Sequence, residues 1–428
     1  MTSCSTTPFA VNGRTYAPPD RPVVVICLDG SADDYFDAAL ARDRMPNLKR
    51  MCVTGYRGFA RSAMPSFTNV NNSSIVTGVP PSVHGIGGNF FFDVNKGEEV
   101  MMNSATYLRA ETIFPAAART GRKVAVITAK EKLRDIFASG LIGPNGGIAF
   151  SSEKANLARA ESHGISAVEE LVGRATPPIY SAEASLFVLQ AGVALLEKGL
   201  ADFVYLSTTD YMQHKFPPTA AESIDFYAAI DREIGRLLEG GAVLGLTADH
   251  GMNAKQNTDG SPKVIYLETL LSKQFGRGFR VILPITDPYV KHHGALGSFA
   301  QVHLPPDAAA RLSLQDVIAF LLRQPGITEA HDRATAARLL ELPPDRMGDL
   351  VVCSGRDVVL GRTPEHHDLS QLEAPLRSHG GRYEEMVPFM FSAPLASAYA
   401  ARAAGDARNF DVFDFAINGL QPGPSSTS

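Results

Sequence analysis

Continuous apolar runs alternate with helical patterns through the first 250 residues. Apolar runs of strand length occupy residues 23–28, 122–128, 202–207 and 242–248. Helical spacing occurs in residues 43–53, 68–76, 109–120, 182–199 and 220–239. The strand runs do not alternate between apolar and polar residues, which is typical of strands covered by helices on both faces. The pattern predicts an α/β fold with a doubly wound, mainly parallel sheet.

The pattern changes after Leu271. Residues 281–284, 300–304 and 350–353 are predicted as strands, and residues 314–323 as an amphipathic helix. We therefore expect residues 275–365 to form a smaller inserted α+β cap. The core would then comprise residues 21–274 and 366–420, with an N-terminal extension (1–20) and a flexible Pro/Ser/Gly-rich tail (421–428).

Composition narrows the class of protein. The chain has 428 residues, of which 45% are hydrophobic, so it can bury a large core and a smaller domain. The net charge of −5 and the lack of a basic run argue against nucleic-acid binding. We expect neither a secretion signal nor a membrane span, and four cysteines without Cys-x-x-Cys spacing suit free thiols. We expect a cytoplasmic protein; its oligomeric state is left open, with a homodimer as one option.

Candidate metal ligands follow three of the apolar runs. Asp29 follows residues 23–28, Asp210 follows the run that ends at residue 207, and Asp249-His250 follows the run at 242–248. His214 is four residues after Asp210, so the two share a face if a helical turn begins there. Alone, each pair is more often a cap, a surface pair or a turn. At the carboxyl ends of neighbouring parallel strands, where ligands bind, they predict a two-metal hydrolase.

A nucleophile is expected in the segment Met64-Pro-Ser-Phe-Thr-Asn-Val-Asn-Asn-Ser73. A helix is predicted to begin near Phe67 or Thr68, and a hydroxyl there would lie beside backbone N–H groups that favour a bound anion. Both Ser66 and Thr68 are candidates, and either could instead be a simple N-cap. Spacing alone does not choose between them.

Two longer segments carry a family resemblance. Thr-Asn-x-Asn-Asn-Ser-Ser-Ile-Val-Thr-Gly-Val-Pro at 68–80 and His-Gly-Ile-Gly-Gly-Asn-Phe-Phe-Phe-Asp at 84–93 resemble the alkaline phosphatase superfamily, especially its nucleotide pyrophosphatase/phosphodiesterase branch. The ligand residues also occur in that family's order. The resemblance implies two Zn²⁺ ions per chain. The implied ligands are Asp29, Asp249, His250 and the Thr68 oxygen at one site, and Asp210, His214 and His379 at the other.

The histidine of the second site is assigned by resemblance only. His379 lies in Arg377-Ser-His-Gly-Gly381, which could pass for a polar loop, and spacing leaves His366 and His367 as equal alternatives. His292 and His293 are expected at a surface or at the cleft entrance.

The resemblance also implies a reaction. Thr68 would attack phosphorus to form a phospho-threonine, which water would then hydrolyse. Asn89 is expected to bind a nonbridging oxygen, although it could be only a turn residue after two glycines, and His214 is expected to contact substrate as well as metal.

Two lysines bear on the substrate. Lys130 and Lys132 follow the strand at 122–128 and could clamp a carboxylate, although a solvated charged turn is as good an interpretation of the spacing. The segment Thr128-Ala-Lys-Glu-Lys-Leu133 resembles the phosphonoacetate hydrolase family, which cleaves phosphonoacetate to acetate and phosphate. We therefore expect a small-molecule phosphonate substrate. The alternatives are a phosphodiesterase or nucleotide pyrophosphatase, for which residues 90–92 could offer an aromatic slot, and a phosphosugar mutase.

Overall fold

The fold is built on a seven-stranded sheet. The computed structural model describes residues 7–143, 146–286, 294–306, 312–372 and 374–421. The strand order is β4-β19-β10-β3-β9-β7-β8, and only β19 runs against both of its neighbours. The strands are β3 (Val23–Cys27), β4 (Tyr56–Arg61), β7 (Val124–Thr128), β8 (Ile148–Ser151), β9 (Phe203–Ser207), β10 (Val243–Thr247) and β19 (Met386–Phe391). The predicted doubly wound, mainly parallel sheet is confirmed, and each of the four predicted core strands belongs to it.

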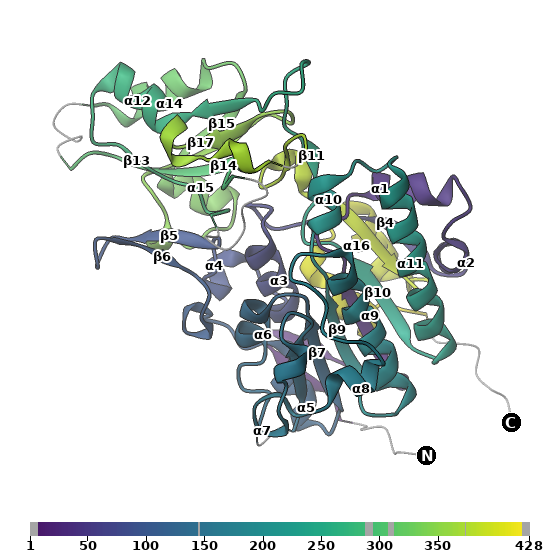
Figure 1. Ribbon diagram of the computed structural model, residues 1–428. Coiled ribbons are helices and arrows are strands. Elements are labelled where there is room, and N and C mark those ends of the chain that lie inside the picture. Colours follow the sequence, from purple (N-terminus) through teal and green to yellow (C-terminus); the bar gives the residue numbers. More distant parts are fainter. Residues whose placement is uncertain (1–6, 144–145, 287–293, 307–311, 373, 422–428) are drawn as a thin grey trace, which may run out of the picture.

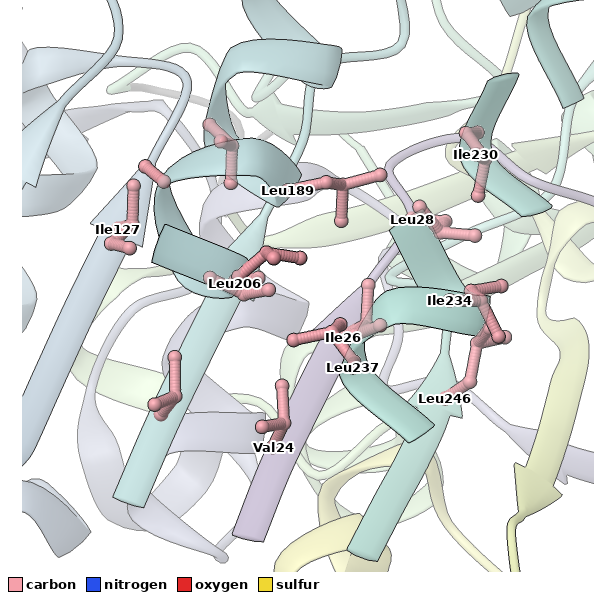
Figure 2. Packing of buried hydrophobic residues seen from close by; sticks show 14 of the residues in the cluster. Val24, Ile26, Leu28, Ile127, Leu189, Leu206, Ile230, Ile234, Leu237 and Leu246 are labelled. Carbon is pink, nitrogen blue, oxygen red and sulfur yellow. The ribbon is translucent and has the colours of Figure 1, made fainter. Parts of the chain in front are cut away.

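Helices cover both faces because the strands are apolar on both. In β3 all five side chains are buried: Val24 and Ile26 face one apolar cluster, and Val23, Val25 and Cys27 face another. The first face carries α1 (Asp33–Leu40), α2 (Pro46–Thr54), α9 (Ala182–Glu197) and α11 (Ala221–Glu239). The second carries α5 (Ile113–Arg119), α6 (Glu131–Phe137) and α17 (Val412–Asn418). Figure 2 shows α9 and α11 packing Leu189, Ile230, Ile234 and Leu237 onto Val24, Ile26, Leu206 and Leu246 of the strands.

A second, four-stranded sheet lies beyond α3 (Thr68–Thr77) and is coloured green in Figure 1. Its order is β13-β14-β16-β15, all antiparallel. It comprises β13 (Arg280–Ile282), β14 (Phe299–His303), β15 (Ile327–Asp332) and β16 (Leu350–Ser354), with helices α12 (Leu267–Phe275), α14 (Leu314–Leu322) and α15 (Arg333–Leu339). Phe67 and Val70 of the α3 segment pack into the apolar cluster of this second sheet. The start of α3 is therefore held between the two sheets.

Shorter elements complete the described chain. They are β1 (Phe9–Val11), β2 (Arg14–Tyr16), α4 (Pro81–His84), β5 (Phe90–Asp93), β6 (Glu98–Met101), α7 (Ala160–His163), α8 (Val168–Val172), α10 (Tyr211–Lys215), β11 (Asn253–Ala254), β12 (Val264–Tyr266), β17 (Val359–Gly361), β18 (Arg377–Ser378) and α16 (Ser397–Gly405). His292 and His293 lie outside the described residues. None of the helices in the described ranges combines the length and apolar character needed to span a bilayer.

Candidate metal centre

Three adjacent strands deliver the acidic ligand candidates. Asp29 follows β3, Asp210 follows β9 and Asp249 follows β10, and these strands are neighbours in the order β10-β3-β9. All three carboxylates are buried. Gly30 has φ +70° and a Cβ there would lie 2.9 Å from Asp210 Cβ, so a glycine after Asp29 allows the two acidic loops to approach closely.

Two groups of side chains could each hold a cation. The Asp210 group consists of Asp210, His214 and His379, and the Asp29 group of Asp29, Asp210 and His250; within each group the ligand atoms lie within 4.8 Å of one another. In the Asp210 group, Asp210 Oδ2 is 3.0 Å from His214 Nε2 and 3.8 Å from His379 Nε2. The short α10 brings His214 onto the face of Asp210, as the i, i+4 spacing predicts.

In the Asp29 group, His250 Nε2 lies 3.3 Å from Asp29 Oδ1. Asp249 is not a member of this group but lies next to it: its Oδ2 is 3.8 Å from His250 Nε2, compared with 3.3 Å for Asp29 Oδ1. Its other oxygen accepts the backbone N–H groups of Gly30 and His250. The two groups form one centre, because they share Asp210 and because the rings of His250 and His379 stack with centroids 3.5 Å apart.

The three imidazoles are oriented as metal ligands. In each ring Nδ1 faces a backbone carbonyl oxygen, that of Arg377 for His214 (2.8 Å), Gly251 for His250 (2.9 Å) and Ser66 for His379 (2.8 Å). Because a carbonyl only accepts, Nδ1 must carry the proton, which leaves the Nε2 lone pair directed into the centre. This outer hydrogen bond is characteristic of metal-binding histidines.

The electrostatics also fit bound cations. Burial and the neighbouring Asp29 raise the pKa of Asp249 to about 8. Burial opposes protonation of His250, but Asp249 and Asp29 outweigh it and raise the pKa of His250 to about 9. Buried carboxylates that repel one another need positive charge nearby, and a divalent cation supplies it without a proton. The mixed imidazole and carboxylate donor set suits zinc.

The structure distinguishes the two candidate nucleophiles by their surroundings. Thr68 is the first residue of α3, and its Oγ1 lies 3.3 Å from His250 Nε2 and 3.5 Å from Asp29 Oδ1. The Ser66 hydroxyl instead donates to the Gly381 carbonyl at 2.8 Å. Only the threonine hydroxyl therefore faces the ligand atoms.

The alternative histidines lie away from the centre. His367 donates from Nδ1 to the Gly294 carbonyl and accepts the Arg362 N–H at Nε2. His366 is exposed, with Nδ1 2.8 Å from the Thr363 hydroxyl. Of these two and His379, only His379 lies in a ligand group.

The two lysines share a cavity beside the centre. Lys130 Nζ lies 3.4 Å from Asp29 Oδ2 and 3.6 Å from Asp210 Oδ1, so it faces a carboxylate of each group. Burial raises the pKa of Asp210, but Lys130 and His214 outweigh it and hold that pKa well below its usual value. Lys130 and Lys132 both line a cavity of about 540 Å³, together with Asn103, Lys154 and Tyr180.

Asn89 contacts the segment that follows β13 of the second sheet. Its Nδ2 donates to the Ile285 carbonyl at 3.1 Å, and its backbone N–H donates to the Pro284 carbonyl. Its Oδ1 is buried and lacks a hydrogen-bond partner among the described residues. The Nδ2 hydrogen bond therefore holds the Asn89 side chain to the segment that follows β13, and its role in substrate binding stays a prediction.

Sequence reasoning missed Asn72, which connects Asp249 and Thr68 by hydrogen bonds. Its Nδ2 donates to Asp249 Oδ2 and to the Thr68 carbonyl, both at 3.1 Å. Its Oδ1 accepts from the hydroxyls of Tyr205 (2.6 Å) and Ser207 (2.8 Å). The available sequence signal was the α3 segment, in which seven of ten residues are polar; the structure buries the whole helix.

The sequence of the chain matches a family of phosphate-ester hydrolases. Residues 23–382 match the family model of type I phosphodiesterase / nucleotide pyrophosphatase. A venom phosphodiesterase of Naja atra is 24% identical over 249 residues, and an ectonucleotide pyrophosphatase/phosphodiesterase of Bos taurus is 22% identical over 248 residues. These alignments cover 54% of this chain and 26% and 25% of the two relatives, so the chain spans about a quarter of their length.

Solved structures give a fuller match. Phosphonoacetate hydrolase from Sinorhizobium meliloti 1021, in complex with phosphonoacetate, has a TM-score of 0.92 and 46% identity, with coverage of 97% of this chain and 99% of that one. Human ectonucleotide pyrophosphatase/phosphodiesterase 5 shares the fold, with a TM-score of 0.62 and 15% identity over 95% of this chain and 97% of that one. The chain thus belongs to the type I phosphodiesterase / nucleotide pyrophosphatase family of the alkaline phosphatase superfamily, in the group that contains phosphonoacetate hydrolase.

Proposed function

We propose that this enzyme is a two-zinc hydrolase that cleaves the carbon–phosphorus bond of phosphonoacetate, giving acetate and phosphate through a phospho-threonine intermediate. The observation that carries the proposal is Lys130, whose ammonium group lies within 3.6 Å of the carboxylates of both Asp29 and Asp210 and also lines the adjoining cavity. The homologous enzyme was solved with phosphonoacetate and with phosphonoformate, both of which pair a phosphonate with a carboxylate.

The ligands would divide as the family resemblance implies. Asp29, Asp249, His250 and the Thr68 oxygen would hold one zinc, and the Asp210 group the other. When bound, zinc ions lower the pKa of a nearby hydroxyl and stabilise charge during an in-line displacement at phosphorus. Support comes from the donor set and from the inward direction of three Nε2 atoms.

The first step would transfer the phosphoryl group to Thr68. Its Oγ1 forms a bond to phosphorus while the carbon–phosphorus bond breaks and its electron pair stays on carbon. The proton lost by the hydroxyl is balanced by the proton that the methylene carbon takes up as acetate forms. Backbone N–H groups at the start of α3 and the Asn89 amide would bind the nonbridging oxygens.

The lysines would make the carbon a leaving group. Charge that develops on carbon can pass into the neighbouring carboxylate, and Lys130 and Lys132 would stabilise it there. Water then attacks phosphorus, breaks the bond to Thr68 Oγ1 and releases phosphate. A phosphonate without the carboxylate would not make these contacts with the lysines, so they would also confer specificity.

The family match keeps phosphodiester hydrolysis as the second candidate function. That chemistry needs an apolar slot for a nucleoside. Phe91 is buried against Ile86 and Met102, and the Arg280 guanidinium lies 4.2 Å from the Phe92 ring centre, so these rings already have partners.

Phosphate release from a panel of substrates tests the proposal. The panel comprises phosphonoacetate, phosphonopyruvate, 2-aminoethylphosphonate and an aryl phosphodiester. We expect phosphonoacetate to be turned over fastest; faster hydrolysis of the phosphodiester would transfer the conclusion to the second function. We also propose a cytoplasmic location, which the free thiols of Cys27, Cys52 and Cys353 support.

A further inference from the structure

A buried ion pair outside the ligand set joins the two sheets. Lys255 and Glu384 are both fully buried, with Nζ 2.8 Å from Oε1. The Lys255 ammonium also donates to the Ser298 hydroxyl and to the Arg356 carbonyl, each at 2.7 Å. All three of its hydrogens are therefore used. Ser298 directly precedes β14 and Arg356 follows β16, so both lie on the second sheet's side.

Glu384 extends the same network to the metal centre. Its Oε2 accepts the Gly381 N–H at 3.0 Å, and its main-chain carbonyl accepts the Gly251 N–H at 2.8 Å. Gly381 is two residues after His379, and Gly251 directly follows His250. The side chain of Glu384 therefore holds the His379 turn, whereas its backbone holds the His250 turn.

The His379 turn has other contacts too, among them the Ser66 N–H, which donates to the Gly380 carbonyl at 3.3 Å. On its opposite side the Ser66 hydroxyl donates to the Gly381 carbonyl, and the Ser66 carbonyl accepts from His379 Nδ1. Gly380 has φ +113°, and a Cβ there would lie 2.2 Å from the Phe67 ring, so the turn is closely fitted against the segment that carries Thr68. The Ser298 N–H donates to the His379 carbonyl at 2.9 Å.

Stability alone does not account for this pair. The desolvation cost of two buried charges roughly cancels their attraction, and apolar replacements of similar volume are often neutral or stabilising. A fully hydrogen-bonded ion pair does fix the geometry of the groups around it. Here those groups are the turns that follow His250 and His379.

We propose that Lys255 and Glu384 are positioning residues for the metal centre. They hold the His379 turn against the second sheet and thereby set the affinity of the Asp210 group for its cation. The inference rests on the two-metal part of the proposed function and is independent of the substrate.

Zinc affinity of purified variants tests the inference. Glu384→Gln removes the charge and keeps the size, and Lys255→Met removes the cation; each is titrated with zinc against a chromogenic chelator. We expect one of the two zinc equivalents to bind roughly 10- to 100-fold more weakly, as for other residues that support metal ligands. At limiting zinc kcat should fall and at excess zinc it should recover, with KM for phosphonoacetate unchanged.

Arg122→Met is the matched control. Arg122 is also a buried cation, donates to the Pro19 carbonyl and lies 3.1 Å from Asp202, but it is at the opposite end of the sheet, just before β7. It should lose stability and keep both zinc affinities. If Glu384→Gln and Lys255→Met also bind two zinc ions as tightly as the unchanged enzyme, the inference is overturned.

The same samples separate this inference from the proposed function. Weakened zinc binding in the two variants, together with an unchanged enzyme that does not release phosphate from phosphonoacetate, would uphold the positioning role and refute the proposed substrate.

Discussion

Replacement of Lys130 tests how the enzyme selects its substrate. Lys130→Met keeps most of the side-chain volume and removes an ammonium group that is 3.4 Å from Asp29 Oδ2 and 3.6 Å from Asp210 Oδ1. In the proposed mechanism those carboxylates would coordinate zinc, and the ammonium would pair with a substrate carboxylate in the adjoining cavity. The variant should therefore harm phosphonoacetate turnover much more than turnover of an aryl phosphate ester, which has no carboxylate.

The structure sets the size of the expected loss. Unit charges about 4 Å apart attract by about 4 kcal/mol at an effective dielectric constant near 20. Measured hydrogen bonds to charged groups are worth about 1.5–3 kcal/mol. The Lys130 side chain is only 12% exposed, so screening is weak and the upper part of that range applies. We expect kcat/KM for phosphonoacetate to fall about 100-fold, the equivalent of about 3 kcal/mol.

The assay compares two substrates on one preparation. Initial rates with phosphonoacetate and with 4-nitrophenyl phosphate are measured for the unchanged enzyme, for Lys130→Met and for Lys132→Met, after elemental analysis has established equal zinc content. An equal loss on both substrates at equal zinc content would refute the carboxylate clamp and assign Lys130 to the metal centre alone.

Four further outcomes are expected. Elemental analysis should find two zinc ions per chain, and a chelator should abolish activity that added zinc restores; full activity with fewer than one zinc would contradict the two-metal mechanism. Thr68→Ala should abolish turnover while the zinc content and far-UV circular dichroism stay unchanged. Asn72→Leu should cost about 3 kcal/mol in urea unfolding, because it removes the buried hydrogen bonds that Asn72 makes with the hydroxyls of Tyr205 and Ser207 and with Asp249 Oδ2; a loss below about 0.5 kcal/mol would contradict this. Burial raises the pKa of Glu131, but Ser151 and Arg134 outweigh it and lower that pKa below its usual 4.5, so its charge stabilises the fold above pH 4.5 and the contribution disappears as the pH falls below that value. Glu131→Gln should therefore lower the melting temperature more at pH 7 than at pH 3.

The parts of the fold that the sequence predicts are those with long, uniform patterns. The apolar runs of β3, β7, β9 and β10 are fully buried, and α9 and α11 are long enough for their spacing to be clear. The antiparallel edge was not predictable. Tyr56–Arg61 of β4 has one fully buried side chain, and its partner β19 lies more than 320 residues later.

The sequence predicted those candidate ligands that directly follow a strand of the parallel sheet. Asp29, Asp210 and Asp249 could be placed on one rim because parallel strands end together. His379 could not, since it follows a two-residue strand whose pairing with Asn253–Ala254 is set by tertiary contacts. Lys255 and Glu384 resemble ordinary surface charges in the sequence, and only the fold shows that they are buried.

The position of Thr68, the proposed nucleophile, depends on packing against both sheets. The acidic ligands stand on the first sheet, whereas Phe67, immediately before Thr68, packs with Phe299 of the second sheet and against the His379 ring, with ring centres 6.3 and 5.5 Å apart. Because a packed core transmits small changes in volume, the distance from the Thr68 hydroxyl to Asp29 depends on how the second sheet is filled. That sheet is therefore part of the catalytic geometry even where it contributes no ligand.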